Sequence, residues 1–477
     1  MDLKRQTTVS IFWSGLDKVG YQVLALVVGI FTARLLTPTD FGYIAALAIF
    51  TALSNILVES GFTSAMVRRP NNSNADYTAA FIFNILLSII FYLILFFAAP
   101  RIADYFNMPP IISLSRVIFS AIVINSFSIV PNIILTQQLK FKGLATANLG
   151  GMVVSSVITL WLAVKGYGYW AIAAQQISQI VVKVIILWIQ SKWLPTAKPN
   201  FRVIKELLSF SSILILSNLI TTAVRYIYNF FIGPRYSSDD LGYYGQAYKF
   251  HLIPVNVIST SLSSVAYPVL STLNDEKERQ LLYFQKLIKI IAFITFPVVI
   301  GLIATTENFI TVVLTDKWMP MAEYFKLMLV AGATVPFIAI YGNLFTTTGR
   351  PKVTFLMDLI RNLLIISLLF IFNSNINQII LGYIISNYIS MIIICLTMQK
   401  INGYNFFSQI FNIIPPLVIS LVMGAVVYYI GELFEAAKWI VFITQIVAGA
   451  IVYFSIAYIT KMQTMNDIMD IIKNRKK

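Results

Sequence analysis

One stretch of the chain carries a basic side chain and several polar ones inside an otherwise apolar run. They recur mostly at three- and four-residue spacing, which places them on one face of a helix: Asn218, Thr221, Thr222, Arg225, Tyr228 and Asn229. A guanidinium in apolar surroundings is costly unless it faces a cavity or a partner. Arg225 therefore lies in a cavity wall that binds an anionic head group, or it pairs with a carboxylate such as Glu59; we favour the cavity.

A similar stripe lies in the first apolar run of the chain. Its members are Ser14, Asp17, Lys18, Tyr21 and Gln22. Asp17 and Lys18 are adjacent, so they either neutralise each other locally or contact a ligand, and the sequence leaves both interpretations open. We take Lys18 and Gln22 as candidates for substrate binding and Asp17 as a candidate for binding a coupling ion.

Other apolar runs also contain polar groups. Gln175 and Gln179 give one run a polar face that either hydrogen-bonds sugar hydroxyls or ties helices together. Glu59 is either a proton or cation site or a partner for Arg68, and both interpretations stay open. The substrate-binding candidates are therefore Lys18, Gln22, Gln175, Gln179, Arg225, Tyr228, Asn229 and Lys249, and the coupling-ion candidates are Asp17 and Glu59.

Some ionisable residues in apolar runs have simpler explanations. Asp358 and Arg361 have the spacing of a local ion pair on a helix, and Arg116 lies near the end of its run. His251 has no second histidine or cysteine nearby, and the single cysteine, Cys395, is typical of a small core residue. We therefore predict no metal site, no catalytic residue and no cofactor apart from H⁺ or Na⁺ as a coupling ion.

The composition indicates that these groups lie in a lipid bilayer. The chain of 477 residues is 58% hydrophobic and only 12% charged, with a mean hydropathy of +0.78, which is typical of an integral membrane protein. Long runs that are continuously apolar, without alternation, indicate helices and exclude a barrel. The fold class we predict is an all-α membrane protein.

Fourteen stretches are long enough to cross a bilayer, which takes roughly 20 apolar residues. They lie near residues 9–36, 41–65, 77–98, 111–135, 144–164, 169–189, 207–232, 241–270, 287–304, 322–345, 353–372, 379–398, 413–430 and 439–459. The first stretch is too long for a cleaved signal peptide and is predicted to remain as a span.

The basic residues alternate in density between successive loops. With the N-terminus in the cytoplasm, the predicted cytoplasmic segments contain most Lys and Arg residues, whereas the predicted outer loop near residues 373–377 contains none. This asymmetry follows the positive-inside rule, so both termini are predicted to be cytoplasmic. The net charge of +15 is explained by topology, and we predict no binding of nucleic acid.

A short motif occurs twice in the same register. Residues 40–43 read Asp-Phe-Gly-Tyr and residues 240–243 read Asp-Leu-Gly-Tyr, each before the second span of a set of six. Because an even number of spans separates the copies, the halves share one orientation and are related by an axis along the membrane normal. Residues 136–142 and 346–352 form a weaker second pair. In the two copies of Asp-x-Gly-Tyr, Asp40 and Asp240 are expected to cap the following helix. Gly42 and Gly242 are expected to allow close packing.

These spans predict three regions. Residues 1–200 form an N-lobe of six helices, residues 201–400 a C-lobe of six more, and residues 401–477 two further helices with a basic cytoplasmic tail. No loop is long enough for a soluble domain, and no cluster of acidic residues could bind metal or serve as acid and base. We therefore do not expect an enzyme.

Several segments, taken in order, resemble the polysaccharide transporters of the multidrug/oligosaccharidyl-lipid/polysaccharide flippase superfamily, which includes bacterial O-antigen and capsule-repeat flippases. The segments are Ala33 to Gly42, Gln138 to Lys142, Gly168 to Ala171 and Gly242 to Leu270. The resemblance implies two six-helix bundles around a central cavity, with two extra C-terminal helices. It also implies a multi-pass protein of the bacterial cytoplasmic membrane that flips undecaprenyl-pyrophosphate-linked oligosaccharides to the outer leaflet for surface polysaccharide or lipopolysaccharide synthesis, among other polysaccharide-assembly proteins.

Two other functions compete with this one. A cation-coupled multidrug antiporter of the same superfamily would have a cavity dominated by carboxylates, whereas the stripes described above are mainly basic. A membrane-embedded glycan polymerase or ligase would need larger outer loops and a group of acid and base residues. The leading hypothesis is a flippase that works by alternating access, with Arg225 and Lys18 near the anionic head group of its substrate.

Overall fold

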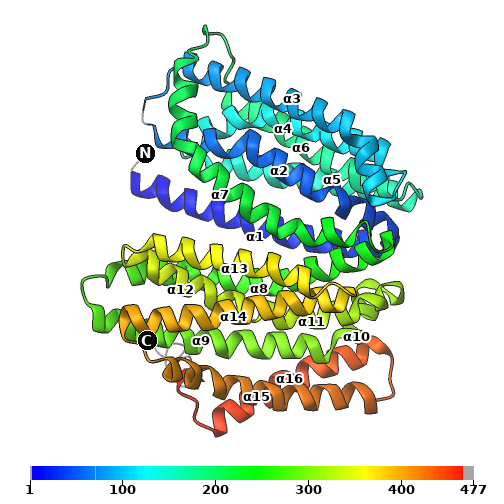
Figure 1. Cartoon of the computed structure of the whole chain (residues 1–477), viewed down its shortest axis with the longest axis vertical. Coiled ribbons are helices and arrows are strands. Elements are labelled where there is room, and N and C mark those ends of the chain that lie inside the picture. Colours follow the sequence, from blue (N-terminus) through cyan, green and yellow to red (C-terminus); the bar gives the residue numbers. More distant parts are fainter. Residues whose placement is uncertain (1–2, 70, 466–477) are drawn as a thin grey trace. The chain divides into compact units, whose positions relative to one another are not determined.

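The computed structural model describes residues 3–69 and 71–465, without the side chains of residues 3–9, 11, 59–62, 64, 209–211, 213 and 214. Over this part of the chain every regular element is a helix and no strand occurs. The chain is an all-α membrane protein, which confirms the predicted fold class. It divides into two compact units, Met1–Gly242 and Tyr243–Lys477, whose helices are labelled in Figure 1.

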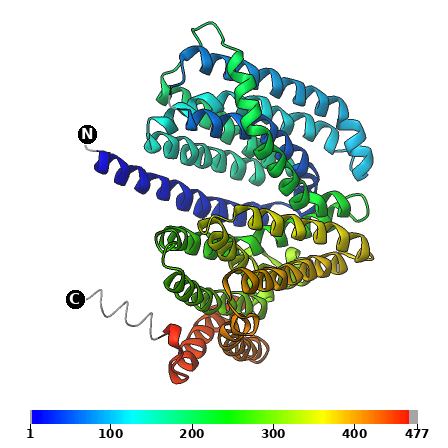
Figure 2. The ribbon, with the colours of Figure 1, turned by 60° about the vertical axis from the view of Figure 1, so that its left-hand side comes forward.

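The first unit contains α1 (Leu3–Leu35), α2 (Pro38–Arg68), α3 (Asn74–Phe106), α4 (Ile111–Gln137), α5 (Phe141–Val164), α6 (Tyr169–Ser191), α7 (Arg202–Ile232) and the start of α8 (Ser238–Thr272). The second contains the rest of α8, α9 (Lys277–Ala304), α10 (Thr306–Phe309), η1 (Ile310–Leu314), η2 (Asp316–Met321), α11 (Ala322–Gly332), α12 (Val335–Thr347), α13 (Pro351–Ile371), α14 (Ile376–Asn402), α15 (Phe406–Leu433) and α16 (Lys438–Ile459). Figures 1 and 2 show α15 and α16 side by side.

Thirteen of the fourteen predicted membrane spans have a counterpart in the structure. Among the described residues, 13 helical segments are long and apolar enough to cross a membrane. The helix α7, which contains the predicted seventh span, is not one of the 13 but has the necessary length, with 31 residues. The seventh span, and with it the total of fourteen, stays a prediction.

The predicted tenth span, residues 322–345, is not one continuous helix. The α11 helix ends at Gly332 and α12 begins at Val335, with Pro336 in its first turn. A proline here lacks the N–H that would continue the hydrogen-bond ladder of α11, and its ring disfavours helical backbone just before it. The preceding connection, predicted as a loop, contains the short helices α10, η1 and η2.

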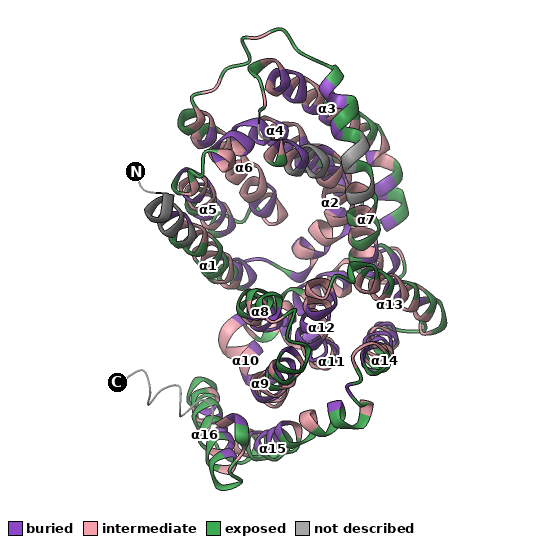
Figure 3. Cartoon of the chain, turned by 90° about the vertical axis from the view of Figure 1, so that its left-hand side faces the viewer, coloured by how far each residue is buried: buried purple, intermediate pink, exposed green. Residues whose placement is uncertain are grey.

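The most enclosed span of each unit occupies the same place in the repeat. In α4, the fourth span of the predicted first half, 67% of the residues in its most apolar stretch are buried. In the segment Asp316–Thr347, which holds the fourth span of the second half, the share is 61%. Most residues of α4 are buried, and α11 and α12 also contain many buried residues, which are purple in Figure 3. In each unit the span with the largest buried share is therefore the fourth of a predicted set of six.

The boundary of the first unit differs from the predicted lobe boundary at residue 200. The first unit extends to Gly242 because α7 packs along α2 and, more briefly, against α3. The linker before α7 is also fixed to this unit: Trp193 Nε1 donates to Asn74 Oδ1 at 2.6 Å, and Asn200 Nδ2 donates to Asp76 Oδ1 at 2.9 Å. The two lobes and their symmetry axis remain a prediction.

The repeated motif caps two helices in the same way. Asp40 Oδ2 accepts the backbone N–H of Thr37 at 2.9 Å, and Thr37 Oγ1 accepts that of Asp40. Asp240 and Ser237 make the equivalent pair of bonds at the start of α8. Each pair satisfies backbone donors that the first turn of a helix leaves without partners. The predicted capping role of both aspartates is confirmed.

Asp40 also reaches a second helix. Its other carboxylate oxygen, Oδ1, accepts the backbone N–H of Tyr169 at 2.8 Å, at the start of α6. The residue before it, Gly168, has a φ of +53°, and a Cβ there would lie 2.7 Å from the same oxygen. One carboxylate therefore holds the first turns of α2 and α6, and the positions of two helix dipoles favour its negative charge.

The two copies of the motif pack against each other. A Cβ at Gly42 would lie 1.9 Å from the carbonyl oxygen of Ser238, and a Cβ at Gly242 would lie 2.0 Å from that of Pro38. Thr39 also donates a hydrogen bond to Asp239, two hundred positions further along the chain. The contact is reciprocal, as a two-fold relation between the repeats requires, and only glycine fits at either position.

The second repeated segment also has the same backbone geometry in both copies. Lys140 N donates to Leu135 O at 2.9 Å after α4, and Arg350 N donates to Phe345 O at 2.8 Å after α12. The residue before each donor has a left-handed backbone, with φ of +53° at Leu139 and +75° at Gly349. Leucine tolerates this conformation poorly, whereas glycine adopts it readily.

We expect Leu139→Gly to stabilise the protein by about 1 kcal/mol, because it removes the steric cost of a side chain in the left-handed region. Thermal unfolding of the purified protein in detergent measures the effect as a higher Tm. Gln138→Gly is the matched control, since Gln138 has φ of −81° and gains nothing from glycine. An unchanged or lower Tm for Leu139→Gly would contradict this explanation.

The reciprocal contact predicts that Gly42→Ala and Gly242→Ala separate the first turns of α2 and α8. A protein carrying Thr39→Cys and Asp239→Cys should form a disulfide under mild oxidation, and either alanine should reduce its yield several-fold. Gly15→Ala is the control, because no atom lies within 4 Å of a Cβ at Gly15. If the yield is the same in all three proteins, the close approach does not depend on the glycines.

Candidate functional site

The polar stripe of α1 divides between two environments. Lys18 and Gln22 are exposed, whereas Asp17 and Tyr21 are partly buried against neighbouring helices. Asn148 Nδ2, on α5, donates to Asp17 Oδ2 at 2.9 Å, and Gln179 Nε2, on α6, donates to the Tyr21 hydroxyl at 2.9 Å. Asp17 is thus tied to α5 and Tyr21 to α6, and the bond of Gln179 is the tie between helices that the sequence had left open as one of two interpretations.

Small residues let these helices approach closely enough for the ties to form. A Cβ at Gly151 of α5 would lie 2.7 Å from the carbonyl oxygen of Gln179, and one at Gly20 of α1 would lie 3.3 Å from Leu149. Close backbone approach of this kind is the usual way in which helices associate in membranes. It explains why short amide side chains on α5 and α6 can reach α1.

Asn148 was missed at the level of sequence. It is the only amide in α5, so no helical stripe marked it. Its bond leaves the other oxygen of Asp17, Oδ1, buried and without a hydrogen-bond partner among the described atoms. Asp17 forms no salt bridge with Lys18 within the described part of the chain, and the choice between local neutralisation and a ligand role stays open.

The stripe of α7 is also divided. Asn218, Thr221 and Arg225 are exposed, whereas Tyr228 is 4% exposed and lies among the core residues. Asn229 Nδ2 donates to the carbonyl oxygen of Ala45 on α2 at 3.1 Å, so it fixes α7 to α2. The exposed part of the stripe, ending at Arg225, is the part available to a ligand.

Arg225 makes no hydrogen bond or salt bridge to any side chain that the structure describes. The carboxylate considered as its alternative partner, Glu59, has a side chain outside the described residues. A coupling role for Glu59 is likewise untested. The guanidinium therefore stands on a membrane-spanning helix with its charge uncompensated by the described residues, a position that is typical of a functional group.

The second unit contributes Lys249, which is exposed on α8. Three further exposed polar residues follow it on the same helical face, namely Asn256, Thr260 and Ser264. Their spacing of seven, four and four residues could have identified this stripe from the sequence. His251, by contrast, is fully buried, with its ring centroid 5.1 Å from that of Tyr248.

The remaining ionisable residues behave as structural groups. Arg361 Nη2 donates to Asp358 Oδ1 at 3.1 Å, which confirms the predicted ion pair. The Arg116 guanidinium lies 4.4 Å from the centroid of the Phe96 ring, a cation–π contact. Gln175 is partly exposed on α6. No group of three or more His, Cys, Asp or Glu side chains that could hold a metal occurs among the described residues.

Comparison with known proteins identifies the family. The family model described as "Polysaccharide biosynthesis protein" matches residues 31–323, more than half of the chain. The chain belongs to this family. The match includes Asp40, Gly42 and their repeated copies as well as Arg225 and Lys249.

Curated relatives of this family member cover most of its length. It is 22% identical to the lipopolysaccharide biosynthesis protein WzxC of Escherichia coli (strain K12), over 90% of the chain and 89% of the relative. It is 23% identical to the teichuronic acid biosynthesis protein TuaB of Bacillus subtilis (strain 168), over 72% of each. It is 21% identical to the succinoglycan biosynthesis transport protein ExoT of Rhizobium meliloti (strain 1021), over 99% and 97%.

Two solved structures show the same fold. The lipid II flippase MurJ in an inward closed conformation matches with a TM-score of 0.78 and 15% identity, over 94% of this chain and 98% of that one. An inward-facing multidrug resistance MATE family transporter of the MOP superfamily matches with a TM-score of 0.64 and 17% identity, over 83% and 98%. At these identities the likeness concerns the fold alone.

The contact between Asp17 and Asn148 makes a prediction for this family member. Asn148→Asp would place a second carboxylate against Asp17, and we expect it to lower the free energy of unfolding by about 1–3 kcal/mol. Combining it with Asp17→Asn exchanges the two groups and should restore most of the loss. Denaturant unfolding of the purified proteins measures both effects.

Gln22→Glu serves as the control for added charge, because Gln22 lies on the same helix but is exposed. It should change stability little. If the exchanged pair is no more stable than Asn148→Asp alone, the two side chains are not coupled and the contact does not hold α1 to α5.

Proposed function

We propose that this family member is a flippase that moves undecaprenyl-pyrophosphate-linked oligosaccharide repeat units from the cytoplasmic to the outer leaflet by alternating access, for surface polysaccharide or lipopolysaccharide synthesis. The names of the relatives support the pathway, since they act in lipopolysaccharide, teichuronic acid and succinoglycan biosynthesis. The fold shared with a lipid II flippase supports the kind of cargo.

The observation that carries the proposal is the sign and exposure of the charges on the spanning helices. Lys18, Arg225 and Lys249 are all exposed there, whereas Asp17 is held by the amide of Asn148. Exposed cations attract a pyrophosphate, and charge-assisted hydrogen bonds to phosphate oxygens are about twice as strong as neutral ones. The cargo that fits these groups is an anion.

Neutral polar groups accompany each exposed cation. Gln22 lies one turn from Lys18 on α1, and Thr221 lies one turn from Arg225 on α7. Amides and hydroxyls of this kind suit sugar hydroxyls, because each can both donate and accept. The same helices thus offer groups for the two polar parts of the cargo, the pyrophosphate and the glycan.

A cation-coupled multidrug antiporter is the second candidate, since a transporter of that kind shares the fold. A cationic drug would be repelled by exposed lysine and arginine side chains, which disfavours this function. A glycan polymerase or ligase would need acid and base groups at one place, and the described residues contain no cluster of three or more acidic, histidine or cysteine side chains. We therefore propose a transporter that catalyses no reaction.

The driving ion and the topology belong to the same proposal. Asp17 is the candidate for coupling to H⁺ or Na⁺, because its Oδ1 is buried without a hydrogen-bond partner among the described atoms. Both termini would lie in the cytoplasm of a bacterium, with the protein in its cytoplasmic (inner) membrane beside other polysaccharide-assembly proteins. Gln175, Gln179, Tyr228 and Asn229 remain candidate residues of the cavity wall.

Arg225→Ala should abolish export of surface glycan and leave lipid-linked repeat units in the inner leaflet, because the pyrophosphate loses a charged contact. Export is measured in a strain whose own copy is deleted, with the amount of membrane protein checked in parallel. Arg225→Lys keeps the charge and should restore part of the export.

Arg361→Ala is the matched control, since it removes an arginine from another spanning helix, where Asp358 already neutralises it. It should leave export largely intact. Normal export by Arg225→Ala at normal protein level would show that Arg225 is structural and that the candidate site is misplaced.

A further inference from the structure

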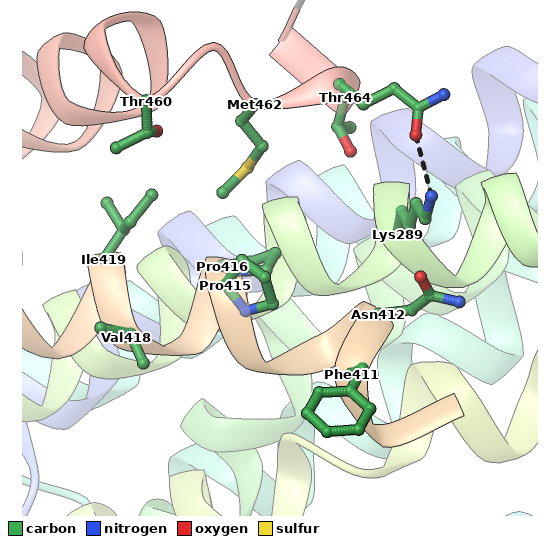
Figure 4. Close-up of a pocket in the computed structure, with 11 residues that line it drawn as sticks. Lys289, Phe411, Asn412, Pro415, Pro416, Val418, Ile419, Thr460, Met462 and Thr464 are labelled. Atoms are coloured by element: carbon green, nitrogen blue, oxygen red, sulfur yellow. Dashed lines mark hydrogen bonds between the residues drawn. The ribbon is translucent and has the colours of Figure 1, made fainter. Parts of the chain in front are cut away.

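A cavity of about 510 Å³ lies in the second unit. None of the residues that line it is a candidate for substrate or ion binding in the proposed function. It is bounded by the first turns of α15, by α9 and by the end of α16 (Figure 4). Its polar lining consists of Lys289, Asn412, Thr460, Gln463 and Thr464. By the predicted topology, this end of the helices faces the cytoplasm.

The polar lining is basic. Among the described residues it contains one lysine and no carboxylate. Lys289 Nζ donates to Gln463 Oε1 at 2.9 Å, the bond drawn in Figure 4. Since the ammonium has three donors, two remain for a ligand, and the neutral amide does not cancel its charge. An anion is the ligand that this group attracts.

The start of α15 supplies hydrogen-bond acceptors to the lining of the same cavity. Pro415 and Pro416 lack backbone N–H groups, so the carbonyl oxygens four residues earlier, at Phe411 and Asn412, receive no hydrogen bond from them. The side chain of Asn412 is held in place by a hydrogen bond to the Tyr404 hydroxyl. Carbonyl oxygens that the prolines leave without the usual helical donor suit hydroxyl groups, and Lys289 suits an anion, so the lining fits a ligand that combines both.

The other side of the cavity is apolar and open. Phe411 is 67% exposed and Val418 is 50% exposed, although both are large hydrophobic residues on a spanning helix. Residues in such positions contact the hydrocarbon of the bilayer. The cavity therefore joins a basic polar floor to a surface that acyl chains cover, as expected for an amphipathic ligand at the membrane interface.

We propose that this cavity binds the head group of an anionic glycerophospholipid, of the phosphatidylglycerol class. The phosphate pairs with Lys289, the glycerol hydroxyls donate to the carbonyl oxygens of Phe411 and Asn412, and an acyl chain lies against Phe411 and Val418. Basic pockets at the cytoplasmic side of membrane helices bind anionic lipids by the same electrostatics. The site is separate from the proposed transport path and would make the C-terminal pair of helices sensitive to the lipid composition of the membrane.

The test uses the full-length protein purified in detergent and titrated with phosphatidylglycerol, with bound lipid counted by native mass spectrometry. Lys289→Gln should weaken binding about tenfold, the loss expected for one charge-assisted hydrogen bond. Asn412→Asp, which is isosteric and brings a carboxylate to the phosphate, should weaken it at least as much. Phosphatidylethanolamine, whose head group is zwitterionic, should bind more weakly than phosphatidylglycerol.

Lys400→Gln is the control for loss of one positive charge at the same predicted side, since Lys400 is exposed at the end of α14 and does not line the cavity. It should bind phosphatidylglycerol like the unaltered protein. The proposal is overturned if Lys289→Gln retains full affinity, if Lys400→Gln loses as much affinity as Lys289→Gln, or if the two lipids bind equally well. Competition by inorganic phosphate alone, with no need for acyl chains, would also overturn it.

Discussion

The first unit depends on a direct backbone contact between the first turn of α2 and the first turn of α8. Gly42 lies against the carbonyl of Ser238, and Gly242 lies against that of Pro38. A side chain at either glycine would force the turns apart, so the contact can form only where both copies of the motif keep glycine. The capping bonds of Asp40 and Asp240 fix the direction in which each helix leaves this contact. The start of α6 is tied to the same point through Tyr169.

The polar groups of the spanning helices fall into two kinds: amides that bond to a neighbouring helix, and cations that are exposed. Amides hold helices together: Asn148 binds Asp17, Gln179 binds Tyr21, and Asn229 binds the α2 backbone. Lys18, Arg225 and Lys249 take no part in these ties and are exposed. A bilayer makes this division necessary, because a polar group with no partner in hydrocarbon is costly. Amide groups thus make these ties between helices, and the proposed function assigns the three exposed cations to the ligand.

Sequence reasoning predicted the features that repeat or follow a period. The two copies of Asp-x-Gly-Tyr, both caps and the close packing of Gly42 and Gly242 followed from the register alone, and the Asp358 and Arg361 pair followed from helical spacing. Isolated contacts between distant helices were not predictable. Asn148 is a single amide in α5, and nothing in the sequence says which side chain it will meet. Pro336 was available as a signal for the break between α11 and α12, but apolar residues continue on both sides and suggested one span.

The bonds of Asp40 also make the two copies of the motif unequal. Asp240 bonds only to Ser237 among the described residues, whereas Asp40 serves its own cap and the start of α6. The symmetry of the backbone is therefore not a symmetry of function. Residues 37–42 contact the first turns of α2, α6 and α8. Residues 237–242 cap α8 and contact residues 37–42. Two copies of one short motif thus hold different places in the chain: both cap a helix, but among the described residues only the first also fixes the start of α6.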